Sequence, residues 1–184
     1  MKNRLSVAVA LLMVLGPLES PARAEERTRQ STGGFVSNGI NQVALQVADG
    51  TNVGQAILIR SQAKGTWGKS QTEALMQWDL DAVTFSPDCF EGGFGLVFPI
   101  VRYDFQTTYS DLSSTHGSLL EGELCVNYQD VSQTRFRFDV KVIGGTGRFA
   151  GATGVTRFQG RTQALPPGRF SVSEGVYETT LTWP

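Results

Sequence analysis

The chain has 184 residues, of which 40% are hydrophobic and 18% charged, and its formal net charge is −1. This composition excludes a disordered chain, and it lacks the basic surplus that is typical of proteins that bind nucleic acid. One histidine and two cysteines cannot supply a conventional zinc site, and we expect neither a metal nor a cofactor.

The N-terminal residues have the pattern of a secretory signal peptide. A basic head ending at Arg4 is followed by an apolar run over residues 5–15, a helix-breaking Gly-Pro pair, and the small-residue cleavage signature formed by Ala22 and Ala24. We therefore predict cleavage near Ala24 and a secreted or periplasmic product; the alternative is an uncleaved anchor helix. The apolar run is short for a bilayer-spanning helix, so no transmembrane segment is expected.

These signals divide the chain into a signal peptide over residues 1–24, a flexible polar leader over residues 25–34, and a single domain over residues 35–184. The length of the last segment suits one domain with one core. Export would bring Cys89 and Cys125 into an oxidising compartment, so we expect them to form a disulfide. Two free thiols are the alternative.

Alternation of apolar and polar residues dominates the predicted domain. The clearest case is residues 134–143, where Phe136, Phe138 and two valines face one way and charged residues face the other. The same alternation predicts strands over residues 72–81, 101–109, 120–128 and 175–183, and further strands are expected near residues 43–47, 55–60, 93–98 and 153–162.

Turn-forming residues separate these segments, including residues 86–88, His116-Gly117 and Gly144-Gly145. An all-β chain with about eight long strands can close into an antiparallel barrel or pack as two sheets. We predict the closed antiparallel β-barrel, similar to calycins, because closure removes exposed strand edges. A β-sandwich is the alternative.

The most specific motif is the string GGTGRFAGATG, which covers residues 144–154. It loosely matches the dinucleotide fingerprint, but the residues after it are typical of a strand, so the helix N-terminus that would bind phosphate is missing. We interpret the motif as a tight corner in which Phe149 plugs one end of the barrel and Arg148 covers the rim or pairs with a carboxylate. The glycines of this corner are Gly144, Gly145, Gly147 and Gly151.

This string, placed after an alternating strand and before two more, resembles the corner of the allene oxide cyclase-like barrel superfamily, which includes the dirigent proteins. Small exported bacterial proteins carry a similar turn. The resemblance implies an eight-stranded antiparallel barrel with a central cavity and frequent oligomers. It also implies either cyclisation of an unstable fatty-acid epoxide or guidance of phenoxy-radical coupling, without a redox cofactor. No functional residue of that family matches a motif here, so none is carried over.

Eight aromatic residues fall on the apolar face of predicted strands and are candidates for lining a ligand pocket. They are Trp78, Tyr103, Phe105, Tyr128, Phe136, Phe138, Tyr177 and Trp183. In a barrel of eight strands such side chains either fill the interior or surround one small ligand. The buried polar atoms of tyrosine and tryptophan need partners, which favours a semi-polar cavity.

We therefore predict an exported barrel that holds a small apolar or aromatic ligand or interacts with another protein, with assembly into a homo-oligomer left open. One alternative is a cofactor-free isomerase or cyclase that confines a reactive intermediate in the cavity. Another is a structural surface protein with a packed core. The lone His116 lies in a polar segment, where we expect it to be solvated rather than catalytic.

Overall fold

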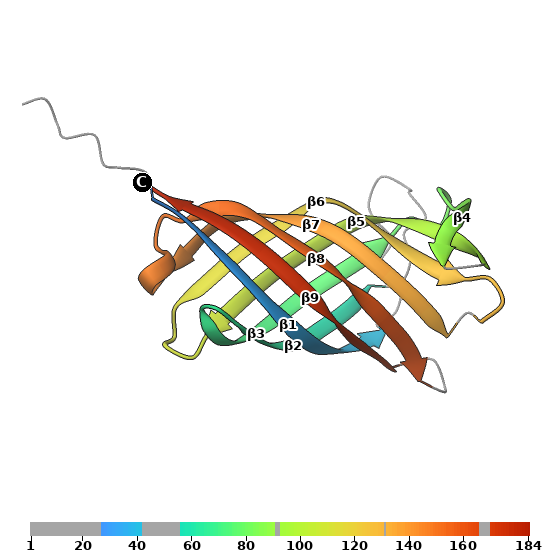
Figure 1. Cartoon of the computed structure of the whole chain (residues 1–184), viewed down its shortest axis with the longest axis horizontal. Coiled ribbons are helices and arrows are strands. Elements are labelled where there is room, and N and C mark those ends of the chain that lie inside the picture. The colour runs from blue at the N-terminus through green and yellow to red at the C-terminus, as the bar shows by residue number, and fades with distance from the viewer. Residues whose placement is uncertain (1–26, 42–55, 91–92, 131, 166–169) are drawn as a thin grey trace, which may run out of the picture.

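The computed structural model describes residues 27–41, 56–90, 93–130, 132–165 and 170–184. In this part of the chain nine β-strands are joined to one short 3-10 helix (Figure 1). The elements are β1 (Arg27–Asn41), β2 (Ile57–Gly65), β3 (Gly68–Trp78), β4 (Thr84–Phe90), β5 (Gly93–Tyr109), β6 (Ser114–Asn127), β7 (Gln133–Thr146), η1 (Gly147–Phe149), β8 (Thr153–Leu165) and β9 (Phe170–Trp183).

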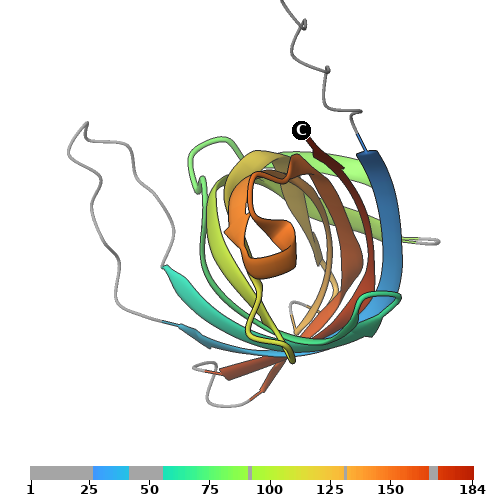
Figure 2. The same ribbon diagram turned by 90° about the vertical axis from the view of Figure 1, so that its left-hand side faces the viewer.

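Eight of the strands close into a barrel in which every pairing is antiparallel, as Figure 2 shows from one end. The order around the barrel is β3-β2-β1-β9-β8-β7-β6-β5, and pairing of β3 with β5 completes the circle. Strand β4 lies outside this circle and pairs only with the first part of β5. The predicted closed antiparallel barrel is therefore confirmed, and the sandwich is excluded.

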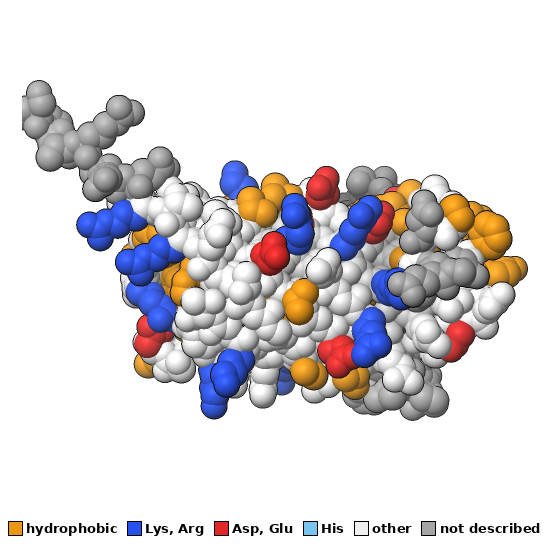
Figure 3. Space-filling view, viewed as in Figure 1, with side chains coloured by type: hydrophobic (Ala, Val, Ile, Leu, Met, Phe, Trp, Pro, Cys, Tyr) orange, Lys and Arg blue, Asp and Glu red, His pale blue; other side chains and the backbone are white. Residues whose placement is uncertain are grey.

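Alternation along the strands separates the core from the solvent, as the sequence of β7 predicts. Phe136, Phe138, Val140 and Val142 are buried, whereas the intervening basic side chains are exposed. On the outer surface, which Figure 3 shows, opposite charges face each other across neighbouring strands. These pairs are Arg60–Glu73, Arg137–Glu123, Arg157–Asp139 and Arg161–Glu174. Each exposed pair contributes less than about 1 kcal/mol, but together they favour this register of the strands.

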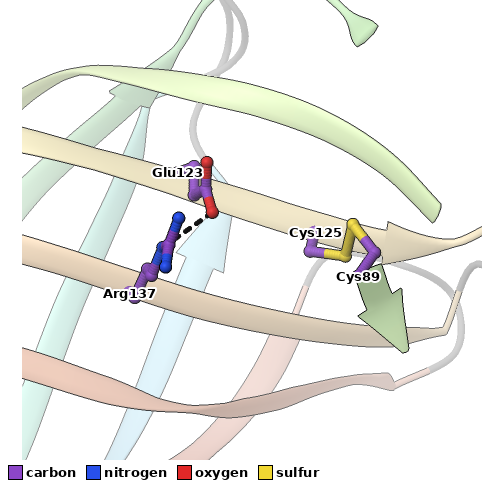
Figure 4. The surroundings of a disulfide bond; sticks show 4 residues. All are labelled: Cys89, Glu123, Cys125 and Arg137. Carbon is purple, nitrogen blue, oxygen red and sulfur yellow. Dashed lines mark ion pairs between the residues drawn. A yellow bond between two sulfur atoms is a disulfide. The ribbon is translucent and has the colours of Figure 1, made fainter. Parts of the chain in front are cut away.

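A disulfide between Cys89 and Cys125 attaches the outer strand β4 to β6 of the barrel (Figure 4). The predicted pairing is thus confirmed. Gly95 of β5 lies beneath the bond, because a Cβ there would be 2.6 Å from the Cys89 sulfur. With a sequence separation of 36 residues, loss of chain entropy in the unfolded state gives the bond a stabilisation of about 4 kcal/mol.

The prediction of a flexible leader over residues 25–34 is wrong from Arg27 onward, where β1 begins. Strand β1 starts at Arg27, which pairs with Trp183 of β9, and its pairing with β2 starts at Gly33. Its inward positions are occupied partly by serine and glycine, so the hydrophobic alternation that marks other strands is hidden. Backbone pairing on both sides nevertheless holds this segment in the sheet. The strand expected near residues 43–47 lies outside the described residues.

Three of the predicted turns are strand segments, and the first two lie in β6 and β4. His116 and Gly117 lie inside β6, where a bulge shifts the pairing with β7. Glycine is needed there for close approach of two strands rather than for a turn, since a Cβ on Gly117 would be 1.9 Å from the Lys141 carbonyl oxygen. Residues 86–88 belong to β4, whose pairing with β5 is irregular between Ser86 and Phe90.

The corner predicted from the GGTGRFAGATG string begins later than expected. Gly144 and Gly145 are still part of β7, and the chain turns only after Thr146. Gly147 and Gly151 carry the positive φ angles of the corner, at 59° and 75°. These angles favour glycine because it has no Cβ to clash with the backbone.

Candidate functional site

The helix η1 covers one end of the barrel (Figure 2). Phe149 at its last position is only 2% exposed. Its ring centre lies 4.6 Å from that of Tyr109, 5.4 Å from that of Trp67 and 6.1 Å from that of Trp183. We call these four aromatic residues the plug. They fill this end of the barrel.

Arg148 holds the plug together from its outer side. One guanidinium nitrogen donates to the Trp67 carbonyl oxygen at 2.7 Å, and Nε lies 3.3 Å from a carboxylate oxygen of Asp111. The guanidinium carbon is 5.0 Å from the ring centre of Tyr109, within the range of a cation–π contact. In return, the indole nitrogen of Trp183 donates to the Arg148 carbonyl oxygen.

Two ionisable groups of the plug region have shifted pKa values. Hydrogen bonds from Ser113, together with the charge of Arg148, hold the pKa of Asp111 below its usual range. Burial raises the pKa of Tyr109 to about 12, although a hydrogen bond with Thr115 acts in the opposite direction. At neutral pH the plug therefore has an ion pair on its outer side and a neutral phenol within.

A cavity of about 340 Å³ occupies the opposite half of the barrel. This volume is near the lower end of the range for small-molecule pockets. Most of its lining is apolar or aromatic: Phe35, Ile57, Ile59, Met76, Trp78, Leu80, Phe98, Tyr103, Leu124, Val126, Phe136, Phe138 and Phe158. The remaining described lining residues all carry hydroxyl groups: Ser37, Ser61, Thr134, Thr162, Ser171 and Ser173.

Four of the eight aromatic pocket candidates line this cavity. They are Trp78, Tyr103, Phe136 and Phe138. The ring centres of Tyr103 and Phe138 are 4.6 Å apart, and Phe138 stacks on Phe158 at 5.0 Å. The cavity is thus bordered by a connected set of rings.

Two other candidates, Phe105 and Tyr177, are packed into the barrel and do not line the cavity. Phe105 is 7% exposed and contacts Tyr103 at a ring distance of 6.1 Å. The Tyr177 ring covers glycines of β1 and β2: a Cβ on Gly65 would be 2.0 Å from its hydroxyl oxygen. The space that these glycines leave is therefore filled by Tyr177 and is not available to a ligand.

The last two candidates lie at or beyond the ends of the barrel. Trp183 belongs to the plug. Tyr128 follows the last residue of β6, is 61% exposed and contacts Phe85, which is 67% exposed. Hydrophobic side chains gather at this end of the molecule, where β4 lies (Figure 3). The prediction that Tyr128 lines a pocket is therefore wrong, because β6 ends at Asn127, one residue before Tyr128.

Bulges turn two hydrophobic residues outward, against the alternation that predicts the strands over residues 101–109 and 120–128. Val101 is 45% exposed beside a register shift between β3 and β5, and Leu120 is 51% exposed at a shift between β6 and β7. Each bulge inserts one residue, which reverses the side to which the following residues point. Phe35 and Phe158 also line the cavity but are not among the candidates, although Phe158 lies between the polar Arg157 and Gln159 in a predicted strand.

Tyr103 is the only ionisable side chain among the described residues that line the cavity. Burial raises the pKa of its phenol well above the usual value, so this group is neutral in the folded protein. His116 is exposed on β6 and lies outside the lining. Within the described ranges, no group of three or more potential metal ligands comes together. The lining can enclose an apolar molecule and exchange hydrogen bonds through neutral hydroxyl groups.

Comparison with known proteins identified no relative: no family model, curated protein or solved structure matches this chain. Among the described segments there is also no helix with the length and apolar character needed to cross a membrane. The function must therefore be inferred from the cavity itself.

Proposed function

We propose that this protein is an exported barrel that binds a small apolar or aromatic ligand in its interior. The observation that carries the proposal is the cavity of about 340 Å³ bordered by Trp78, Tyr103, Phe136 and Phe138. A purely structural barrel would fill this volume with side chains, because close packing maximises dispersion contacts. A ligand that occupied the space would restore those contacts and remove its own apolar surface from water.

Export is supported by two independent features. The N-terminal pattern ending at Ala24 is typical of a signal peptide. The disulfide between Cys89 and Cys125 fits an oxidising compartment. We also propose kinship with the allene oxide cyclase-like barrels, which is supported by the eight-stranded closure and by the place of residues 144–154 at one end of the barrel.

The proposal is tested with N-phenyl-1-naphthylamine, a neutral dye whose fluorescence increases in apolar surroundings. The purified protein should bind it saturably at one site. Ser171→Phe adds a ring within the cavity. We expect it to weaken dye binding at least about tenfold, because the apolar contact area that the dye loses corresponds to more than about 1.4 kcal/mol of binding free energy. Val172→Phe is the matched control, since the neighbouring side chain is 38% exposed on the outer face.

Circular dichroism and thermal melting establish that both variants are folded. Met76→Phe fills the cavity from another strand and should weaken binding as well, which separates occupation of the cavity from local damage at Ser171. Absence of saturable binding to the wild-type protein would overturn the proposal, as would equal binding by the Ser171 and Val172 variants. If the dye binds as expected, native mass spectrometry of protein isolated from its source would identify the natural ligand.

A further inference from the structure

A row of hydroxyl side chains runs around the inside of the barrel, with one member on each of its eight strands. Consecutive members are directly opposite partners on neighbouring strands. The row consists of Thr134 (β7), Thr162 (β8), Ser173 (β9), Ser37 (β1), Ser61 (β2), Thr72 (β3), Thr107 (β5) and Thr115 (β6). We call this row the hydroxyl belt.

The hydroxyl belt is a spiral and not a closed ring. Thr115 at its end pairs with Gly145 of β7, whereas the belt began on the same strand at Thr134. Such an offset is expected because the strands of a closed barrel are tilted and staggered. The belt therefore starts in the half of the barrel that contains the cavity and ends near the plug.

The two parts of the belt differ in how their hydroxyl groups are satisfied. The part near the plug is buried, and its members have partners: the Thr72 and Thr107 hydroxyl oxygens are 2.7 Å apart, and Thr115 bonds to Tyr109. The other five members all line the cavity, and we call them the cavity arc: Thr134, Thr162, Ser173, Ser37 and Ser61. Within this arc one hydrogen bond joins Thr162 to Ser173 at 2.7 Å.

The wall opposite the cavity arc is apolar. Strands β3, β5 and β6 provide Met76, Trp78, Phe98, Leu124 and Val126, with the neutral phenol of Tyr103 among them. No described lining residue carries a charge. A charged ligand would lose its hydration without gaining a counter-charge, which is strongly unfavourable. A neutral oxygen-bearing ligand would instead bond to the hydroxyl groups on one side and contact hydrocarbon on the other.

We propose that the cavity selects neutral ligands that carry hydroxyl or carbonyl oxygens along one edge and a ring or hydrocarbon surface on the other. Serine and threonine hydroxyls both donate and accept hydrogen bonds, so the cavity arc suits alcohols and ketones alike. Carboxylates, sulfonates and ammonium groups are excluded. This inference rests on the proposed ligand-binding function and specifies the class of ligand.

The test uses three molecules that share one hydrocarbon cage and differ in a single substituent: adamantane, 1-adamantanol and 1-adamantanecarboxylate. Each is assayed at neutral pH for displacement of N-phenyl-1-naphthylamine. In the variant Ser37→Ala/Thr162→Val/Ser173→Ala, the apparent affinity for the alcohol should fall about 3- to 10-fold, as expected for the loss of a typical hydrogen bond, while that for adamantane changes less than about twofold. The carboxylate should not displace the dye from the wild-type protein.

Thr156→Val/Thr179→Val is the matched control. These two hydroxyl groups are also buried and lie 2.9 Å apart across β8 and β9, but they do not line the cavity. The control should leave the affinities for the alcohol and for adamantane unchanged. The single variant Ser37→Ala should show the same selective loss for the alcohol, about twofold or more, if the triple variant does not fold.

The outcomes separate this inference from the proposed function. Failure of the dye to bind the wild-type protein would contradict the proposed function itself. If the dye binds but the cavity-arc variants weaken alcohol and hydrocarbon equally, the inference is wrong and the binding function stands. Competition by the carboxylate that is as strong as competition by the alcohol would overturn it in the same way.

Discussion

Replacing Phe149 by alanine tests how one end of the barrel is closed. The side chain is 2% exposed and contacts three other rings. Truncation of a buried phenylalanine costs about 3–5 kcal/mol. Because Trp67, Tyr109 and Trp183 are themselves only partly buried, they can relax into the space, and we expect the lower value of about 3 kcal/mol. For a domain of this size that corresponds to a decrease in Tm of roughly 6–12 °C.

The assay is equilibrium unfolding in guanidinium chloride with the disulfide intact, followed by tryptophan fluorescence. Phe85→Ala is the control, since this side chain is 67% exposed and its loss should cost less than about 1 kcal/mol. Dye binding should be unaffected by Phe149→Ala, because the cavity lies in the other half of the barrel. A loss no larger than that of the control would refute the packing of the plug, and weaker dye binding by a folded variant would refute the separation of plug and cavity.

Three further predictions concern the backbone and the surface. Gly117→Ala should destabilise the barrel by about 1–3 kcal/mol through overpacking, whereas Gly34→Ala, whose Cβ would be 3.7 Å from its nearest neighbour, should be tolerated; thermal melting of both checks this. Leu112 has a φ of 65°, so Leu112→Gly should raise the unfolding free energy by about 1 kcal/mol. The pKa of Asp111 is lowered in the folded state, so its contribution is present above its unfolded pKa and is lost as the pH falls through the folded value; Asp111→Asn should flatten the acid limb of a stability–pH curve.

Hydrophobic alternation was sufficient to predict the barrel where both faces of a strand carry a clear signal. In β7, phenylalanine and valine alternate with arginine, aspartate and lysine, and the predicted inward set is the buried set. The export pattern and the even number of cysteines likewise predicted the disulfide. These features are local in the sequence, so they can be recognised without knowledge of which strands are neighbours.

The features that escaped prediction depend on bulges or on pairing between distant strands. Nothing local in the sequence indicates that Val101 and Leu120 lie at register shifts and point outward. The first part of β1 is predicted as a leader because Ser31 and Gly33 occupy inward positions that are usually apolar. The hydroxyl belt was likewise invisible, because its members are directly opposite partners only in the folded sheet.

Register also explains which rings border the cavity beside the hydroxyl belt. Next to the first four members of the hydroxyl belt runs a row composed of Phe136, Gly160, Gly175 and Phe35. A Cβ on Gly160 would be 2.7 Å from the Phe136 ring, and one on Gly175 would be 2.9 Å from the Phe35 ring. The Phe136 and Phe35 rings therefore lie over the glycines and border the cavity, while the small hydroxyl side chains of the next row leave space beside them. The size and the polarity of the cavity thus both depend on two adjacent rows, one of phenylalanine and glycine and one of serine and threonine.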